Sequence, residues 1–179
     1  MHFTQTSMKN FQKLLRLTCI LVLMGVAFIP TRASAQLIIG GETSATFING
    51  VNIDLAPIIG YKVMGFSAGV SPVAMYTASG TMSGEFSYGG RVFAEYDIWK
   101  GILVHAEFEA LNTGYLNNTG IRLRNWTMGA PIGAGYEYEI TKGVWFKGMV
   151  LYDALLQMDL NQSSPRANPT VRGGITYVF

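Results

Sequence analysis

Residues 168–179 constrain the possible fold of this sequence most. Read as an extended strand, one face of this stretch is apolar and carries Val171, Gly173, Ile175, Tyr177 and Phe179. The opposite face is polar and carries the charge of Arg172. A strand that crosses a bilayer needs about 9–11 residues and alternates lipid-facing with lumen-facing side chains. The stretch therefore predicts the closing strand of a membrane β-barrel.

The amino-terminal segment, residues 1–35, predicts a secretory signal peptide. It has three early basic residues and no acid, an apolar run over 17–29, and an Ala33-Ser34-Ala35 cleavage pattern. We expect cleavage after Ala35, so that the mature domain spans residues 36–179. An uncleaved membrane anchor is the alternative, but the apolar run is shorter than the roughly 20 residues that a spanning helix needs.

Removing this segment changes the charge and the thiol content of the chain. Four of the thirteen basic residues and the single cysteine, Cys19, lie within residues 1–35. The formal net charge then falls from +2 to −2, since all eleven acids remain. We therefore expect no disulfide, and no affinity for nucleic acid based on charge.

The rest of the chain divides into runs that alternate apolar and polar residues, separated by turn signals. Asn49-Gly50, the strongest short hairpin signal, separates the first two. These runs predict an all-β, eight-stranded antiparallel up-and-down transmembrane barrel. A soluble lipocalin-type barrel has the same strand number but needs apolar residues inside and charges outside. The predicted strands are Ile38–Ile48, Val51–Lys62, Phe66–Tyr76, Phe86–Asp97, Ile102–Leu111, Trp126–Glu139, Val144–Leu156 and residues 168–179.

The predicted connections alternate in length after the first hairpin. Those at Val63–Gly65, Ile98–Gly101 and Ile140–Gly143 are tight, whereas those at Thr77–Glu85, Asn112–Asn125 and Gln157–Asn168 are longer. Short periplasmic turns and longer outer loops are typical of outer-membrane barrels, so we expect both termini to lie in the periplasm.

Prolines and aromatic residues add two further expectations. Pro57, Pro72 and Pro131 fall inside predicted strands, and each should mark a bulge or a local strand end. Aromatic residues gather at the strand ends, as in the two girdles of a membrane barrel. The periplasmic girdle would hold Tyr61, Phe66, Tyr96, Trp99, Tyr138, Trp145, Phe146, Tyr177 and Phe179, and the outer girdle Tyr76, Tyr88, Trp126 and Tyr152.

Nearly all the charged residues of the predicted strands share the inward parity. The interior of eight strands is just wide enough for side chains to fill, so we expect a charge network in the lumen rather than a wide pore. Arg91 should pair with Glu95, Glu107 or Glu137, and Arg172 with the first and seventh strands. A proton- or ion-conducting file is the alternative. The predicted network comprises Glu42, Asp54, Arg91, Glu95, His105, Glu107, Glu109, Glu137, Lys147, Asp153 and Arg172.

An enzymatic interpretation is weaker. His105 beside carboxylates could join a hydrolase triad, but the pattern places it inside the lumen and sets no serine beside it. We expect no catalytic residue, cofactor or metal site, because residues 36–179 contain one histidine and no cysteine. Arg122 and Arg124 in a predicted loop could touch lipopolysaccharide phosphates, although solvated loop charges are the simpler interpretation.

Three segments resemble small outer-membrane β-barrel proteins of Gram-negative bacteria: Gly89-Gly-Arg-Val-Phe-Ala-Glu-Tyr96, Leu103-Val-His-Ala-Glu-Phe-Glu109 and residues 168–179. The resemblance implies an eight-stranded barrel in the outer membrane without a defined catalytic residue. The terminal pattern Ile175, Tyr177, Phe179 looks like the signal that barrel assembly machinery recognises in its clients.

The expected function is a non-enzymatic integral outer-membrane barrel, either structural or presenting its three longer loops for interaction. The expected partners are outer-membrane lipid, lipopolysaccharide and, during biogenesis, the assembly machinery. A narrow channel or carrier for small or hydrophobic solutes is the main alternative, and an outer-membrane lipid-modifying enzyme is the second.

Overall fold

The computed structural model describes residues 35–46, 51–79, 82–116, 122–157 and 168–179. The predicted signal peptide therefore lies outside the described residues except for Ala35, and the Asn49-Gly50 hairpin lies outside them as well. Within the described ranges, no helix is both long enough and apolar enough to cross a membrane.

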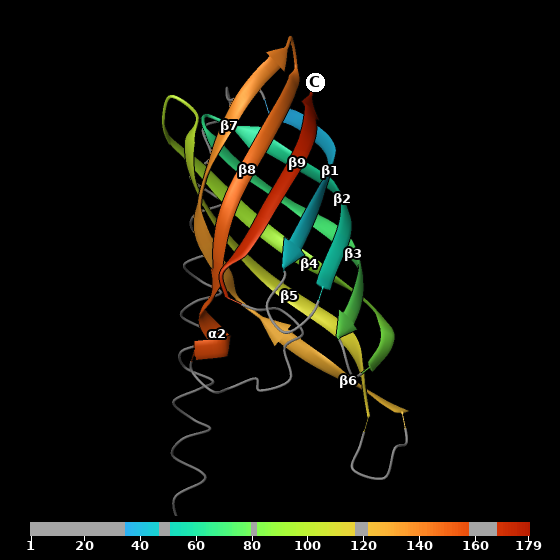
Figure 1. The fold of residues 1–179 in the computed structure, drawn as a ribbon. Coiled ribbons are helices and arrows are strands. Elements are labelled where there is room, and N and C mark those ends of the chain that lie inside the picture. The colour runs from blue at the N-terminus through green and yellow to red at the C-terminus, as the bar shows by residue number, and fades with distance from the viewer. Residues whose placement is uncertain (1–34, 47–50, 80–81, 117–121, 158–167) are drawn as a thin grey trace, which may run out of the picture. The chain divides into compact units, whose positions relative to one another are not determined.

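The described residues from Gln36 onward form a β-barrel of antiparallel strands (Figure 1). Strands that follow one another along the chain pair, except β6 and β7, and pairing of β1 with β9 and of β4 with β5 closes the sheet. A short helix, α2 (Ala154–Gln157), follows β8. The strands are β1 (Gln36–Thr46), β2 (Val51–Val63), β3 (Phe66–Ser79), β4 (Met82–Trp99), β5 (Ile102–Leu116), β6 (Arg122–Gly129), β7 (Pro131–Thr141), β8 (Val144–Asp153) and β9 (Thr170–Val178).

β6 and β7 are two parts of one barrel strand. Both pair with β5, and the register is the same on either side of Ala130, with Glu109 opposite Gly129 and Ile102 opposite Tyr136. The closed barrel therefore has eight strands in up-and-down order, which confirms the predicted fold class.

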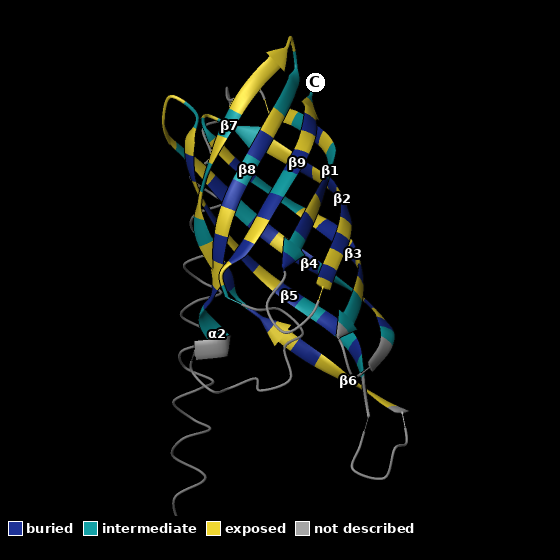
Figure 2. Ribbon diagram, viewed as in Figure 1, coloured by how far each residue is buried: buried dark blue, intermediate teal, exposed yellow. Residues whose placement is uncertain are grey.

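Burial alternates along the strands as the sequence pattern predicted (Figure 2). In β2, for example, Asn52 and Asp54 are buried, whereas Ile53 and Leu55 are exposed. Successive side chains of a strand point to opposite faces of the sheet, so each strand contributes one face to the lumen and one to the outside. The apolar set faces outward and the polar set faces inward.

Three tight turns lie at one end of the barrel, which we call the turn end. β2 and β3 are joined by Met64–Gly65 and β4 and β5 by Lys100–Gly101, with φ positive at both residues of each turn. This is the geometry of a type I′ hairpin turn, whose twist matches that of the strands it joins. Lys142–Gly143 joins β7 to β8 at the same end. The opposite end is called the loop end.

The loop end contains more strand than the sequence predicted. The predicted loop Thr77–Glu85 is wrong, because β3 continues to Ser79 and β4 begins at Met82. The predicted loop Asn112–Asn125 is also wrong at both ends, since β5 continues to Leu116 and β6 begins at Arg122. The Ser, Thr, Gly and Asn residues of these two segments are typical of loops. Backbone pairing between strands, however, does not require apolar side chains.

The predicted seventh strand, Val144–Leu156, is also too long in the structure. β8 ends at Asp153, and the last residues of the predicted strand belong to α2. The Asp153 carboxylate accepts a hydrogen bond from the Leu155 backbone amide at 3.0 Å and so satisfies the amide of the first turn.

The prolines interrupt ladders without shifting the register. Pro57 on β2 and Pro72 on β3 lie at the same rung, where neither can donate a backbone hydrogen bond, and the pairing resumes in register on both sides. The hydroxyl of Ser71 donates instead to the Pro57 carbonyl at 2.6 Å. The bulge predicted at these two positions is therefore wrong, whereas Pro131 does mark a local strand end, between β6 and β7.

Candidate functional site

The middle of the lumen holds seven charged or titratable side chains, which we call the central cluster. They come from five strands, and contacts such as Arg91 with Glu42 join strands that are not neighbours in the sheet. All seven belong to buried residues. The central cluster comprises Glu42 (β1), Arg91 and Glu95 (β4), His105 and Glu107 (β5), Lys147 (β8) and Arg172 (β9).

Arg172 and Glu107 form the best-satisfied pair of the cluster. Arg172 donates from Nη1 to Glu107 Oε2 at 2.5 Å and from Nη2 to Oε1 at 2.9 Å, across the lumen between β9 and β5. Two parallel charge-assisted hydrogen bonds fix both planar groups. Arg172 Nη1 also lies 3.7 Å from Glu42, so it links the first strand to the fifth.

Arg91 is held less completely. Its Nη2 donates to Glu42 Oε2 at 3.2 Å, and its Nη1 lies 3.8 Å from Glu107 Oε2. Among the described residues, its Nε and Nη1 make no hydrogen bond although they are buried. The predicted pairing with Glu107 is thus a long contact, the predicted pairings with Glu95 and Glu137 are wrong, and Glu42 is the main partner.

His105 and Lys147 complete the cluster on the side nearer the turn end. The two ring nitrogens of His105 lie 2.8 Å from Glu95 Oε1 and 2.9 Å from Glu107 Oε2. Lys147 Nζ lies 2.5 Å from Glu95 and 3.0 Å from Glu42. Glu95 therefore serves Lys147 and the imidazole, and Glu107 serves Arg172 and the imidazole. Glu42 lies within 3.7 Å of three cations, so that the cluster is one connected network.

A second, smaller group of charges lies at the turn end. Lys62 Nζ is 2.8 Å from Asp97 and 2.6 Å from Glu137. These side chains are partly exposed. Glu137 therefore joins this turn-end cluster rather than the central one. Lys62 and Asp97 have the inward parity that the alternation predicts for them, and Lys62 was expected to pair inside the lumen, but the alternation alone gave no signal of this partnership.

The other predicted network residues lie toward the loop end. Asp54 accepts hydrogen bonds from the Ser44 backbone amide at 3.0 Å and its hydroxyl at 2.7 Å. Asp153 accepts from the Ala130 amide at 3.0 Å, beside the interruption between β6 and β7. Glu109 is buried and lies opposite Arg91 in the β4–β5 ladder. Asp54 and Asp153 thus support the backbone of the barrel wall locally.

Apolar side chains fill the space around these charges. One group combines Ala56, Val73, Met75 and Leu111, and another combines Leu103, Met149 and Leu151. Phe93 stacks on the His105 ring with centroids 6.0 Å apart. A small cavity of about 10 Å³ lies between the two charged clusters and is lined by Glu95, Glu137 and Lys147. It has room for roughly one water molecule. The middle of the lumen is therefore filled by side chains.

The outward surface carries the predicted aromatic residues near both ends of the barrel. Tyr61, Tyr96 and Tyr138 are exposed near the turn end, and Tyr76 and Trp126 near the loop end. Trp145 departs from the prediction. It is only half exposed, has the inward parity of Lys147, and lies with its ring centroid 5.2 Å from Lys62 Nζ.

Arg124 lies on strand β6 rather than in a loop, and it ties three strands together. It donates to the Asn112 side chain at 2.5 Å and, from Nη2, to the carbonyls of Phe86 at 3.0 Å and Asn112 at 2.8 Å. Its guanidinium also lies 5.0 Å from the Tyr88 ring centroid. These contacts join the β5–β6 hairpin to β4 beyond the last β4–β5 rung, which is Tyr88 opposite Asn112.

The three residues of the predicted assembly signal lie on the outward face of β9 and just after it. Ile175, Tyr177 and Phe179 are exposed, and the rings of the two aromatic residues meet edge to face at 4.5 Å. The Phe179 amide donates to the Leu37 carbonyl at 3.0 Å, so this end of the chain is tied to β1.

Within the described ranges, no group of three or more His, Cys, Asp or Glu side chains is arranged so that it could hold a metal ion. The comparisons with known proteins add no family. No family model matches the chain, and no curated protein matches it.

Solved structures with a similar fold are barrels. The N-terminal β-barrel domain of Pseudomonas aeruginosa OprF is 14% identical, with a TM-score of 0.42, over 81% of this chain and 96% of that one. Ail of Yersinia pestis, solved with the heparin analogue sucrose octasulfate, is 14% identical with a TM-score of 0.44, over 82% and 99%. A de novo designed transmembrane β-barrel is 12% identical with a TM-score of 0.40, over 80% and 95%. At these identities the likeness concerns the fold alone.

Proposed function

We propose that this chain is an integral outer-membrane β-barrel of a Gram-negative envelope, with a structural or interaction role and without enzymatic activity. The observation that carries the proposal is the distribution of polarity across the barrel wall. The outward face is a continuous belt of exposed apolar residues such as Leu55, Val92 and Ile132, whereas the buried face is mostly polar and charged. Such a protein is stable only where its outside meets hydrocarbon.

The filled lumen supports a structural or interaction role over transport. The central cluster links β1, β4, β5, β8 and β9 across the interior, and apolar side chains occupy the remaining space. The Arg172–Glu107 pair, with two charge-assisted hydrogen bonds, spans this interior from β9 to β5. His105 faces two carboxylates inside this cluster, which leaves neither ring nitrogen for a serine.

The loop end would provide the interaction surface. Because the strands there are longer than predicted, this surface consists of the extended strands β3 to β6 as well as their connections. Among the described residues, β6 pairs with β5 alone, and Arg124 holds the hairpin in place. In the proposed orientation, with residues 1–35 removed as a signal peptide and both termini periplasmic, this end faces outward toward lipopolysaccharide.

Reconstitution of residues 36–179 tests the proposal. We expect the protein to require detergent or lipid to stay folded and dispersed, and to give no steady conductance in a planar bilayer at high protein load. A protein that remains folded and monomeric without detergent would contradict the membrane assignment. A reproducible unitary conductance that changes in Arg172→Ala would favour the narrow channel instead.

A further inference from the structure

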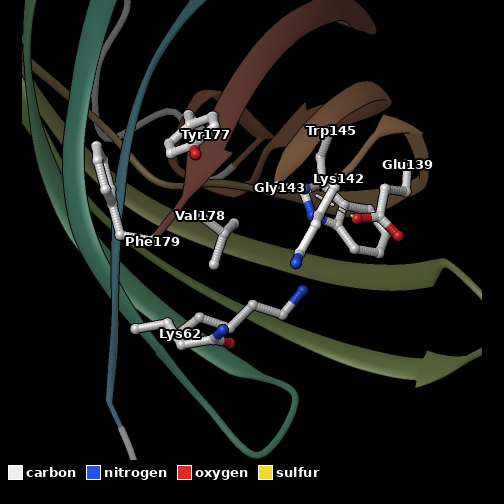
Figure 3. Close-up of a pocket in the computed structure, with 9 residues that line it drawn as sticks. Lys62, Glu139, Lys142, Gly143, Trp145, Tyr177, Val178 and Phe179 are labelled. Atoms are coloured by element: carbon white, nitrogen blue, oxygen red, sulfur yellow. Dashed lines mark hydrogen bonds between the residues drawn. The ribbon is translucent and has the colours of Figure 1, made fainter.

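A pocket of about 620 Å³ lies at the turn end, beside the Lys142–Gly143 turn (Figure 3). Binding sites for small molecules commonly have volumes of about 300–1,000 Å³. Its lining combines charged and aromatic side chains from β2, β7, β8 and β9, chiefly Lys62, Glu139, Lys142, Trp145, Tyr177 and Phe179. The pocket is separate from the central cluster, and the proposed function gives it no role.

Backbone hydrogen bonds hold the walls of this pocket in place. The Val178 amide donates to the Gly143 carbonyl at 2.8 Å, which fixes the β7–β8 turn against β9. The Gly143 amide donates to Glu139 Oε1 at 3.0 Å, which orients that carboxylate. A site whose walls are already ordered loses little conformational entropy when a ligand binds.

The pocket presents charges of both signs. Figure 3 shows the side chains of Lys62 and Lys142 reaching into it. An ammonium group has three N–H donors, and Lys62 has two carboxylate partners, Asp97 and Glu137, so that one donor remains. Lys142 is exposed and forms no ion pair with any residue that the structure describes.

The balance of these charges selects the class of ligand. The pocket lining carries Lys62, Lys142 and Glu139, and Lys62 already pairs with Asp97 and Glu137 outside that lining. Lys142 and Glu139 therefore remain as one cation and one anion, and a purely anionic ligand would leave Glu139 without a counter-charge. A ligand with both a phosphate and an ammonium group could place the phosphate at the lysines and the ammonium at Glu139.

The rim of the pocket joins the lumen mouth to the apolar outer surface. Trp145 lies on the inward side, whereas Tyr177 and Phe179 are exposed on the outward belt. A ligand could therefore keep a polar headgroup in the pocket while apolar chains lie along the outer wall. Aromatic residues with one apolar and one wet side are typical of this depth in membrane proteins.

We propose that this pocket binds the headgroup of a zwitterionic phospholipid, with the phosphate held by Lys142 and Lys62 and a primary ammonium held by Glu139. The assignment of the ligand as a lipid rests on the proposed function, which places the barrel in a membrane. The shared chemistry, a phosphate with a primary ammonium, could also come from a soluble phosphoethanolamine compound.

Ligand titration of the folded protein in detergent tests this proposal. Trp99→Phe and Trp126→Phe leave Trp145, in the pocket wall, as the only tryptophan. We expect short-chain phosphatidylethanolamine to change its fluorescence saturably, and phosphatidylglycerol to bind about tenfold more weakly, a difference of about 1.4 kcal/mol. Glycerophosphoethanolamine, which lacks acyl chains, should bind more weakly than the lipid.

Matched lysine variants locate the site. Lys142→Gln should weaken phosphatidylethanolamine binding by about tenfold, as loss of one charge-assisted contact predicts. Lys100→Gln, in the turn between β4 and β5 and outside the pocket lining, should leave binding unchanged. Glu139→Gln should reduce the preference for phosphatidylethanolamine over phosphatidylglycerol. Retention of the lipid in native mass spectrometry gives a readout that does not depend on Trp145.

Four results would overturn the proposal: no saturable binding by either readout, equal effects of the two lysine variants, equal affinity for the two lipids, or an unchanged lipid preference in Glu139→Gln. Binding of glycerophosphoethanolamine as tight as that of the lipid would overturn the lipid assignment in favour of a soluble ligand. These results are distinct from failure of the membrane assignment, which would appear as a protein that needs no detergent.

Discussion

The two faces of the barrel wall differ in polarity, and the difference bears directly on the solvent proposed for the outside. Val92 and Arg91 are neighbours in β4, yet the apolar residue is 54% exposed and the arginine is 3% exposed. In a water-soluble barrel the hydrophobic effect would place them the other way round. The comparison shows that inward charges satisfy one another, while the outward belt is left without protein partners and needs an apolar environment.

The largest expected effect on stability comes from substitutions on the inward face. Arg172→Ala should destabilise the protein by about 3–5 kcal/mol, because Glu107 would keep a buried charge without its bidentate partner. Arg91→Ala should cost less, since Arg91 donates one hydrogen bond within the cluster. Denaturant unfolding in lipid vesicles measures both. An Arg91→Ala effect equal to or larger than that of Arg172→Ala would contradict this ranking of the two arginines.

The next largest effect on stability comes from placing a charge on the outward face. Val92→Arg should cost about 2–4 kcal/mol in a bilayer, as a charge facing hydrocarbon near the middle of a strand does, whereas Ile98→Arg near the turn end should cost about 1 kcal/mol or less. The two positions are almost equally exposed, at 54% and 58%. Unfolding in vesicles should therefore separate them by depth alone. Equal, small effects would mean that both side chains face water.

A smaller effect concerns the backbone hydrogen bonds between neighbouring strands of the barrel. Ser71→Ala should cost about 1 kcal/mol, because the Pro57 carbonyl would lose the hydroxyl that substitutes for a missing ladder bond. Ser87→Ala on β4 is the matched control, since Ser87 is similarly buried but lies away from the Pro57–Pro72 rung. The same unfolding assay should show the difference between the two variants, and equal losses would exclude this role for Ser71.

The smallest effect separates the turn-end cluster from the central one. Lys62→Met should cost about 1 kcal/mol or less, because Lys62, Asp97 and Glu137 are partly exposed to water and salt. Its effect should shrink further as the salt concentration rises, whereas the effect of Arg172→Ala should stay nearly constant. Unfolding at low and high salt distinguishes the two clusters, and equal salt dependence would show that they share one environment.

The sequence predicted the fold and the facing of each strand because alternation is a local property. The polarity of neighbours such as Asn52 and Ile53 assigns them to opposite faces without any knowledge of the partner strand. The tight turns were equally local, since Met64–Gly65 and Lys100–Gly101 carry glycine where φ is positive. Strand ends at the loop end were predicted poorly, because β3 and β4 continue through polar residues that resemble loop.

The partners within the lumen could not be predicted from the sequence. Alternation placed Arg91, Glu42 and Glu107 inside, but which side chains meet depends on barrel closure and on the stagger between strands. Arg91 and Glu42, for example, are on strands that are not neighbours in the sheet. Trp145 was assigned to the periplasmic girdle from its place near the end of a strand, although its parity and its contact with Lys62 are inward.

The central claim is that the outward face of the barrel lies in hydrocarbon, and spin-label accessibility at Val92→Cys tests it most directly. Residues 36–179 contain no cysteine, so the label would occupy a single site, and Lys100→Cys in the exposed turn between β4 and β5 serves as the aqueous reference. In lipid vesicles we predict that the label at position 92 is accessible to oxygen and protected from a water-soluble nickel complex. Nickel accessibility at position 92 equal to that at position 100 would contradict the account.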